Sequence, residues 1–247
     1  MNEAINAAKL RDGAPSLTES ERGPPLQLLL RELGVLVDWA RGAAHLKRGS
    51  NRSIGRGLPV MTVPGFMVDD NRLRLLRLSL NAAGFRAHRW KRGRNFGVTP
   101  DILERMGERV EYLVAKHRRP IALVGWSLGG IYAREYAKRH PENVSRVITM
   151  GTPFSGSPRA NNVWRLYEVI AKHKVDAPPV ELLPMSKPPV PTIALWSPND
   201  GVIMPQAAQG TESERDLAVE LSCGHMGFVC APEAIEAIIA ALVEPLP

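Results

Sequence analysis

Short apolar segments and amphipathic segments alternate along most of this 247-residue chain. From residue 58 onward, apolar stretches such as PIALVGWS and TIALWSPND are separated by segments whose leucine and isoleucine side chains recur every three to four residues. The apolar stretches are typical of buried strands, and the periodic segments are typical of helices that pack on a sheet. This alternation predicts an α/β fold, with a mostly parallel central sheet and helices on both faces.

Two segments fall outside this alternation. Residues 1–57 are expected to form a helical N-terminal extension, because residues 26–46 carry a strong helical pattern and a polar, Gly-rich linker follows them. The extension could pad the core, cover the site or mediate self-association as a homo-oligomer, and padding is the simplest interpretation. Within a catalytic domain over 58–247, residues 154–190 are proline-rich and predict a cap insertion with one helix around 162–174.

The segment VGWSLGG lies between an apolar strand pattern and a helical pattern. Its Gly125-x-Ser127-x-Gly129 spacing is typical of a nucleophile elbow, in which serine occupies a strained strand-to-helix turn. Glycine two residues to either side lets neighbouring backbone crowd against that turn. The Ser127 hydroxyl would project above the carboxyl edge of the sheet, at a helix N-terminus. Ser127 is therefore the candidate nucleophile, and an inert serine in a packing turn is the alternative.

A serine hydroxyl needs a general base, and the base needs an orienting carboxylate. In a fold of this kind the partners follow in the order serine, acid, histidine. Three histidines follow Ser127. His140 is expected at a helix end and His173 in the cap, whereas His225 follows the last expected strand in a Gly-rich loop. His225 is therefore the candidate base.

Asp200 is the candidate acid, because it ends the strand pattern TIALWSPND in an Asn-Asp-Gly turn at the expected carboxyl edge of the sheet. An aspartate that merely forms the turn is the alternative interpretation. Asp176 and Glu181, both in the expected cap, are weaker rivals.

The reaction also needs backbone N–H donors for the oxygen that gains charge. We expect them at Leu128 and at Phe66, since Gly65 permits a tight turn in VPGFM; the N–H of Met67 is a second choice. Substrate contacts are expected from side chains beside these positions or in the apolar part of the cap: Met67, Trp126, Phe154, Trp164 and Met226.

Taken together, these motifs resemble the α/β-hydrolase family, especially its compact bacterial lipases and esterases. The resemblance spans residues 58–247, about three quarters of the chain. It implies a serine hydrolase of carboxylic esters without a cofactor, in which Ser127 is the nucleophile, His225 the general base and acid, and Asp200 the orienting residue. The matching stretches are PGF (64–66), GWSLGG (125–130), GTPFSGS (151–157), SPNDGV (197–202) and GHMG (224–227).

Several positions depart from the family pattern. Pro64 stands where the family commonly has histidine before glycine, so the hydrogen bonds around that loop must differ. Phe154 replaces the histidine of a related lipase stretch. GWSLGG also resembles the elbow of the methyl-ester esterases of biotin synthesis, whose His-Gly-Trp stretch is missing here. Bacterial lipases often bind calcium near the catalytic histidine, but no matching aspartate stands beside His225, so no metal is expected.

Composition adds limits on partners and location. The formal net charge is +7, with basic clusters over 47–56 and 86–94. A solvated basic face is favoured over nucleic-acid binding, because no nucleic-acid motif accompanies the charge. The start of the chain has no apolar signal-peptide region and no apolar run is long enough for a membrane span, so a cytoplasmic location without membrane insertion is expected. Cys223 and Cys230 are expected to be free, buried thiols rather than a disulfide.

Three alternatives to an ester hydrolase remain open. An acyltransferase would use the same three side chains with an alcohol or amine in place of water. A non-catalytic binding protein of the same fold would be favoured by a broken triad. Nucleic-acid binding depends on charge alone. In each hydrolytic or transfer reading, the expected partner is a small-molecule ester with an apolar acyl group.

Overall fold

The fold is taken from a computed structural model of the chain. Parts of the expected N-terminal extension and of the expected cap lie outside the described residues. The structure describes residues 23–48, 54–182 and 186–244.

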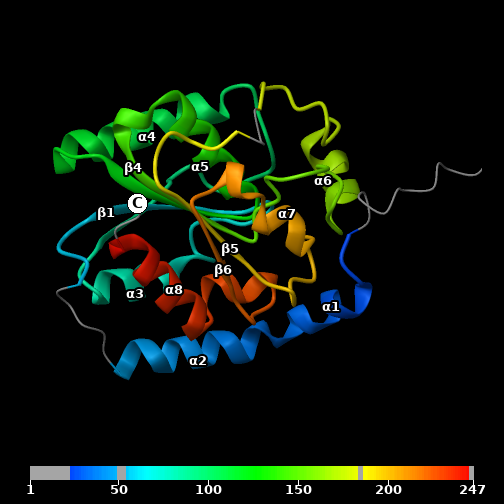
Figure 1. Cartoon of the computed structure of the whole chain (residues 1–247), viewed down its shortest axis with the longest axis horizontal. Helices are drawn as coiled ribbons and strands as arrows, with labels where there is room; N and C mark the ends of the chain where they lie inside the picture. Colours follow the sequence, from blue (N-terminus) through cyan, green and yellow to red (C-terminus); the bar gives the residue numbers. More distant parts are fainter. Residues whose placement is uncertain (1–22, 49–53, 183–185, 245–247) are drawn as a thin grey trace, which may run out of the picture.

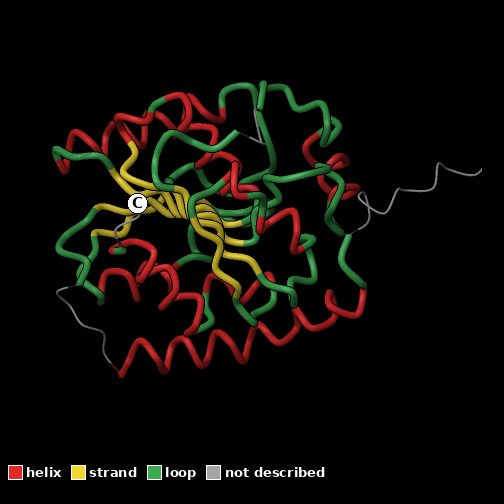
Figure 2. Tube along the Cα trace, viewed as in Figure 1, coloured by secondary structure: helices red, strands yellow, loops and turns green. Residues whose placement is uncertain are grey.

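A six-stranded sheet forms the centre of the molecule, in the order β2-β1-β3-β4-β5-β6 (Figure 1; Figure 2). Every neighbouring pair is parallel. All residues of β1 and β3 are buried, as expected for strands that are covered on both faces. The strands span Pro59–Val63 (β1), Arg86–Arg89 (β2), Ile121–Trp126 (β3), Val144–Met150 (β4), Thr192–Trp196 (β5) and Leu217–Glu220 (β6).

Helices cover both faces of this sheet, which confirms the predicted fold class. One apolar core lies between the sheet and α4 and α5, and another lies between the sheet and α3 and α8 (Figure 1). Within the described part of the chain, no helix has the length and apolar character needed to cross a membrane. The main helices span Leu26–Arg31 (α1), Val35–Arg48 (α2), Arg74–Ala82 (α3), Ile102–His117 (α4), Leu128–Arg139 (α5), Trp164–Ala171 (α6), Pro205–Gln209 (α7) and Pro232–Val243 (α8). Short 3-10 turns span Glu32–Gly34 (η2), Pro141–Asn143 (η3), Glu212–Glu214 (η4) and His225–Val229 (η5).

The N-terminal arm, residues 23–48, is not the single continuous helix that its periodicity predicts. The 3-10 turn η2 separates α1 from α2 at Glu32–Gly34. Gly34 is a poor helix former, and the Glu32 side chain is engaged by loops of the sheet domain. α2 packs along α3 and α8 (Figure 1), and His45 Nε2 lies 2.7 Å from Glu236 Oε1. The arm thus packs against α3, α8 and η5.

The cap region contains one short helix, α6, within the segment where a helix was predicted. Tyr167 of α6 is buried, and its hydroxyl accepts a hydrogen bond from the Val98 N–H at 3.2 Å. Asn162 connects the cap to the arm, because its Nδ2 donates to the Pro24 carbonyl (2.9 Å) and to the Gly201 carbonyl (2.8 Å). The cap is therefore anchored to both the arm and the carboxyl edge of the sheet.

Candidate active site

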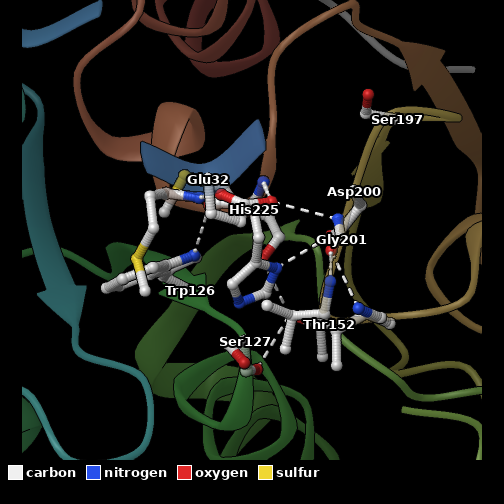
Figure 3. Close-up of polar contacts among 12 residues, drawn as sticks. Glu32, Trp126, Ser127, Thr152, Ser197, Asp200, Gly201 and His225 are labelled. Carbon is white, nitrogen blue, oxygen red and sulfur yellow. Dashed lines mark hydrogen bonds and ion pairs between the residues drawn. The ribbon is translucent and has the colours of Figure 1, made fainter. Parts of the chain in front are cut away.

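Ser127 lies on a strained turn between β3 and α5. Its φ and ψ are 52° and −124°, in a region that residues with a side chain rarely occupy. The turn is fixed by its own backbone, since the Ser127 N–H donates to the Met150 carbonyl at 2.8 Å. The Thr152 hydroxyl donates to the Ser127 carbonyl at 3.0 Å (Figure 3). The elbow predicted from the Gly-x-Ser-x-Gly spacing is thus present.

The two glycines of the elbow have no room for a side chain. A Cβ on Gly125 would lie 2.4 Å from the Gly130 Cα, and one on Gly129 would lie 2.4 Å from the Val63 carbonyl oxygen. Both contacts are with backbone, which cannot swing aside as a long side chain can. The close approach of β1, β3 and α5 around Ser127 therefore depends on these glycines.

Gly125→Ala is expected to destabilise the fold by about 3 kcal/mol, because the added methyl group must push β3 and α5 apart. The measurement is urea unfolding followed by circular dichroism. Gly34→Ala is the matched control, since a Cβ there meets nothing within 4 Å. Equal stability of the two variants would contradict the steric account.

His225 and Asp200 meet behind the elbow. His225 Nδ1 lies 2.8 Å from Asp200 Oδ2, and both side chains are almost fully buried. The other carboxylate oxygen, Oδ1, accepts the N–H groups of Val202 and Ile203 at 2.8 Å each. Asp200 thus has one oxygen fixed by its own turn and one that faces the imidazole. This arrangement favours Nδ1 as the donor, so that Nε2 is the acceptor in the neutral ring.

The rival residues are engaged elsewhere. Asp176 pairs with Arg159 at 2.8 Å. His173 contacts the Tyr167 hydroxyl at 3.2 Å, and His140 lies 3.7 Å from Glu142. Among the six residues considered for the base and the acid, the structure brings together His225 and Asp200.

Ser127 lies below the imidazole in Figure 3, on the side of the ring away from Asp200. Within the described residues, no hydrogen bond joins the Ser127 hydroxyl to His225. Such bonds commonly shorten only when substrate is bound. Gly151 lets this group pack closely, because a Cβ there would lie 2.9 Å from Asp200 Oδ2 and 3.0 Å from His225 Nδ1.

The backbone of His225 is held as firmly as its ring. Trp126 Nε1 donates to the His225 carbonyl at 3.2 Å, and the two rings stack obliquely with centroids 5.5 Å apart. On the other side, Glu32 of the arm accepts the His225 N–H at 2.7 Å (Figure 3). Asp200 and Trp126 thus contact the ring of His225, while Trp126 and Glu32 hold its backbone.

Opposing effects act on the pKa of His225. Burial is the largest single effect, and it lowers the pKa because it disfavours the charged imidazolium. The charge and hydrogen bond of Asp200, together with the charge of Glu32, outweigh burial and raise the pKa above its usual value. The site therefore favours a proton on His225 when one is delivered to it, as a general base requires.

The loop after β1 supplies the second wall of the site. A Cβ on Gly65 would lie 3.1 Å from Ser127 Cβ. Buried Asn95 holds this loop, because its Nδ2 donates to the Pro64 carbonyl at 2.9 Å and its own carbonyl accepts the Met67 N–H at 2.6 Å. Met67 is thus unavailable as an oxyanion donor.

The N–H groups of Phe66 and Leu128 remain as candidate donors. In the described part of the chain, neither makes a hydrogen bond to a protein acceptor. Both residues line the same cavity as Ser127. Two N–H groups without protein acceptors beside a candidate nucleophile can donate hydrogen bonds to an oxygen that becomes negatively charged.

A cavity of about 200 Å³ opens above Ser127. The elbow and the loop after β1 form its base, and the cap forms its walls. Most of its lining is apolar. The lining residues are Phe66, Val98, Ser127, Leu128, Ile131, Pro153, Pro158, Asn161, Val163, Trp164, Tyr167, Val175, Asp176, Pro178, Leu182 and Ile203.

Of the five side chains predicted to contact substrate, Trp164 lines this cavity. Trp126 and Phe154 are instead buried in the core, where Trp126 supports the His225 loop and Phe154 lies under the Arg134 guanidinium at 4.1 Å. Met67 is partly exposed and Met226 packs on the core below the sheet. None of these four side chains lines the cavity as predicted. Met67, Trp126 and Met226 are chain neighbours of site residues, and adjacent side chains on a strand or tight turn face different directions. Phe154 packs against Arg134 instead.

Sequence reasoning missed two residues of the site. Glu32 occupies a polar position of a helical pattern, and such positions are expected to face solvent. Asn95 lies in a loop, RGRNFG, that matches no recognisable motif, so little in the sequence indicates its role. Cys223 and Cys230 are free and buried, as expected, and burial raises the pKa of both thiols. The described residues contain no group of three or more side chains suited to hold a metal ion.

Parts of the chain are similar to known sequences. A family model described as the alpha/beta hydrolase fold matches residues 89–176. The chain is 36% identical over 83 residues to the pimeloyl-(acyl-carrier protein) methyl ester esterase of Nitrosospira multiformis, a match covering 34% of this chain and 29% of that protein. It is 38% identical over 60 residues to the biotin biosynthesis bifunctional protein BioHC of Teredinibacter turnerae, covering 24% of this chain and 10% of that protein. The matches thus cover less than a third of either relative.

Solved structures with a similar fold are described as enzymes of different kinds. The mature lipase of Bacillus licheniformis has a TM-score of 0.56 at 15% identity, covering 76% of this chain and 93% of that one. The monoacylglycerol lipase of Paleococcus ferrophilus has a TM-score of 0.53 at 17% identity, covering 79% of this chain and 96% of that one. A putative non-heme bromoperoxidase of Mycobacterium tuberculosis also has a TM-score of 0.53 at 17% identity, covering 77% of this chain and 94% of that one. These similarities establish the fold, and the chemistry must be argued from the site.

Proposed function

We propose that this chain, which has the α/β-hydrolase fold, is a serine hydrolase that cleaves carboxylic esters through an acyl-enzyme on Ser127. The observation that carries the proposal is the hydrogen bond of 2.8 Å between Asp200 and His225, placed behind a serine on a strained elbow. A structural serine does not need a buried, carboxylate-oriented imidazole beside it.

In the proposed reaction, His225 Nε2 takes the proton of the Ser127 hydroxyl as Oγ attacks the ester carbonyl carbon. The carbonyl oxygen becomes negative and is stabilised by the N–H groups of Phe66 and Leu128. The imidazolium then gives its proton to the leaving alcohol as the C–O bond breaks. Water repeats the sequence on the acyl-enzyme and releases the acid, which restores Ser127.

The substrate proposed is an ester whose acyl or alcohol group is apolar. The cavity walls are built mainly from aliphatic and aromatic side chains, so burial of apolar surface would drive binding. The carboxylate of Asp176 in the wall is already paired with Arg159, which disfavours recognition of a cationic group there.

The test is hydrolysis of p-nitrophenyl esters with acyl chains of increasing length. The expected result is turnover with saturation, and a chain-length optimum that reports the depth of the cavity. Absence of turnover across the series, together with no labelling by a fluorophosphonate, would contradict the proposal and favour a binding protein of the same fold.

Trp164→Ala is expected to raise KM roughly tenfold for esters that reach the cap, with little change in kcat, because it removes ground-state contact rather than catalytic groups. The measurement is the full kinetic curve on short and long esters. Trp39→Ala is the matched control, since Trp39 is 56% exposed on the arm and does not line the cavity. A kcat loss at Trp164 with unchanged KM would refute this role.

A further inference from the structure

Glu32 is the one acidic residue of η2, where α1 gives way to α2. Its carboxylate accepts three backbone N–H groups from two separate loops. Oε1 accepts those of His225 (2.7 Å) and Gly201 (3.0 Å), and Oε2 accepts that of Met226 (2.8 Å) (Figure 3). One side chain from the arm thus joins the loop of the candidate base to the turn of the candidate acid.

The two loops are shaped to receive this carboxylate. A Cβ on Gly224 would lie 3.0 Å from both oxygens of Glu32, and one on Gly201 would lie 2.5 Å from the backbone of Leu28 in α1. Glycine at both positions therefore lets the arm approach to hydrogen-bond distance. A side chain at position 201 would collide with the backbone of α1, and one at position 224 would displace the Glu32 carboxylate.

The three N–H groups that Glu32 binds lie in turns, where backbone donors often lack acceptors. His225 and Met226 begin the 3-10 turn η5, where the first N–H groups lack acceptors within the turn. Gly201 follows Asp200 in a tight turn. Within the described residues, no ion pair joins Glu32 to a cation, so these N–H dipoles are what balance its charge.

We propose that Glu32 is a positioning residue of the active site, and that the arm contributes to the site by supplying it. The carboxylate fixes the spacing between the His225 loop and the Asp200 turn, on which the 2.8 Å contact between their side chains depends. This inference deepens the proposed ester hydrolysis and depends on it for the catalytic consequence, but not for the structural one.

Glu32 also contributes charge to its surroundings. Two carboxylates act on the pKa of His225, that of Asp200 and that of Glu32, and both raise it against the opposing effect of burial. Asp38 of α2 faces η5 near Gly227, and Glu233 of α8 binds Ser222 upstream of the loop. The Glu32 contribution can therefore be separated from a general acidic background by comparing it with Asp38.

The experiment compares Glu32→Gln with the matched control Asp38→Asn, which removes the same charge from the same face of the arm. Glutamine keeps the size of Glu32 but places an N–H₂ donor against one of the backbone donors. The expected result is a fall in kcat of roughly 10- to 100-fold, with KM little changed, for Glu32→Gln and near-native kinetics for Asp38→Asn.

A second readout needs no substrate. The ring of His225 is titrated by NMR in both variants, and its titration should move to lower pH in Glu32→Gln, because a charge that stabilises imidazolium has been removed. A purely structural role would lower kcat without moving this titration. Native kinetics and a native titration in Glu32→Gln, or an equal shift in Asp38→Asn, would overturn the inference.

Glu32→Asp covers the case in which the glutamine variant does not fold. It keeps the charge but shortens the reach by one methylene. Its kcat should therefore fall, while the pKa of His225 should stay closer to the native value than it does in Glu32→Gln. A native kcat in this variant would overturn the positioning role. If the wild type does not hydrolyse esters but the titration shifts as described, the proposed function fails, while the electrostatic action of Glu32 on His225 stands.

Discussion

Ser127→Ala should lower kcat/KM for ester hydrolysis by about 10⁴-fold or more while leaving the fold intact. The substitution removes the only atom proposed to form a bond with the substrate. It leaves the backbone of the elbow in place, where the N–H of Ser127 already donates to the Met150 carbonyl. Steady-state hydrolysis of the best p-nitrophenyl ester measures the loss, and thermal unfolding checks that the fold survives.

The control for this variant is Ser213→Ala. Ser213 is an exposed serine of η4 that does not line the cavity. The Ser213→Ala variant should hydrolyse esters at the rate of the wild type. Activity retained in Ser127→Ala, beyond a trace of residual turnover, would place the nucleophile elsewhere and remove the basis of the proposed mechanism.

Asp200→Asn should lower kcat by about 10³- to 10⁴-fold. An asparagine can present an N–H₂ group to His225 Nδ1, which favours the tautomer with its proton on Nε2 and so blocks the base. The loss of the carboxylate charge also lowers the pKa of His225, because Asp200 raises that pKa in the native site. Hence the acid limb of the kcat/KM profile, which requires neutral His225, should move to lower pH.

The matched control is Asp176→Asn, the other aspartate near the cavity. Asp176 lines the wall and pairs with Arg159 rather than with a histidine. Its removal should leave the acid limb in place and change kcat little. If both variants lose activity equally, or if Asp200→Asn keeps the native pH profile, His225 is not oriented by Asp200.

The sequence predicted the parts of the site that follow from local backbone chemistry. The Gly125-x-Ser127-x-Gly129 spacing between a strand and a helix has few other uses, so the elbow was recognisable. His225 and Asp200 follow the carboxyl ends of β6 and β5, and parallel strands bring such ends to one edge of the sheet.

The parts that were not predicted depend on long-range packing. Glu32 lies 193 residues from His225 in the chain, and its helical pattern gave no sign of a break at η2. Trp126 is adjacent to Ser127, yet its ring packs against His225 and does not line the cavity. Proximity in sequence therefore identified the elbow but misplaced the residues that line the cavity.

The most direct test of the central claim is to trap the acyl-enzyme. The protein is mixed with a slowly hydrolysed p-nitrophenyl ester, quenched in acid, and analysed by intact mass and peptide mapping. The account predicts one acyl group per chain, carried by Ser127, and none in Ser127→Ala. An acyl group on another residue, or active hydrolysis without any covalent adduct in quenched samples and without fluorophosphonate labelling of Ser127, would contradict it.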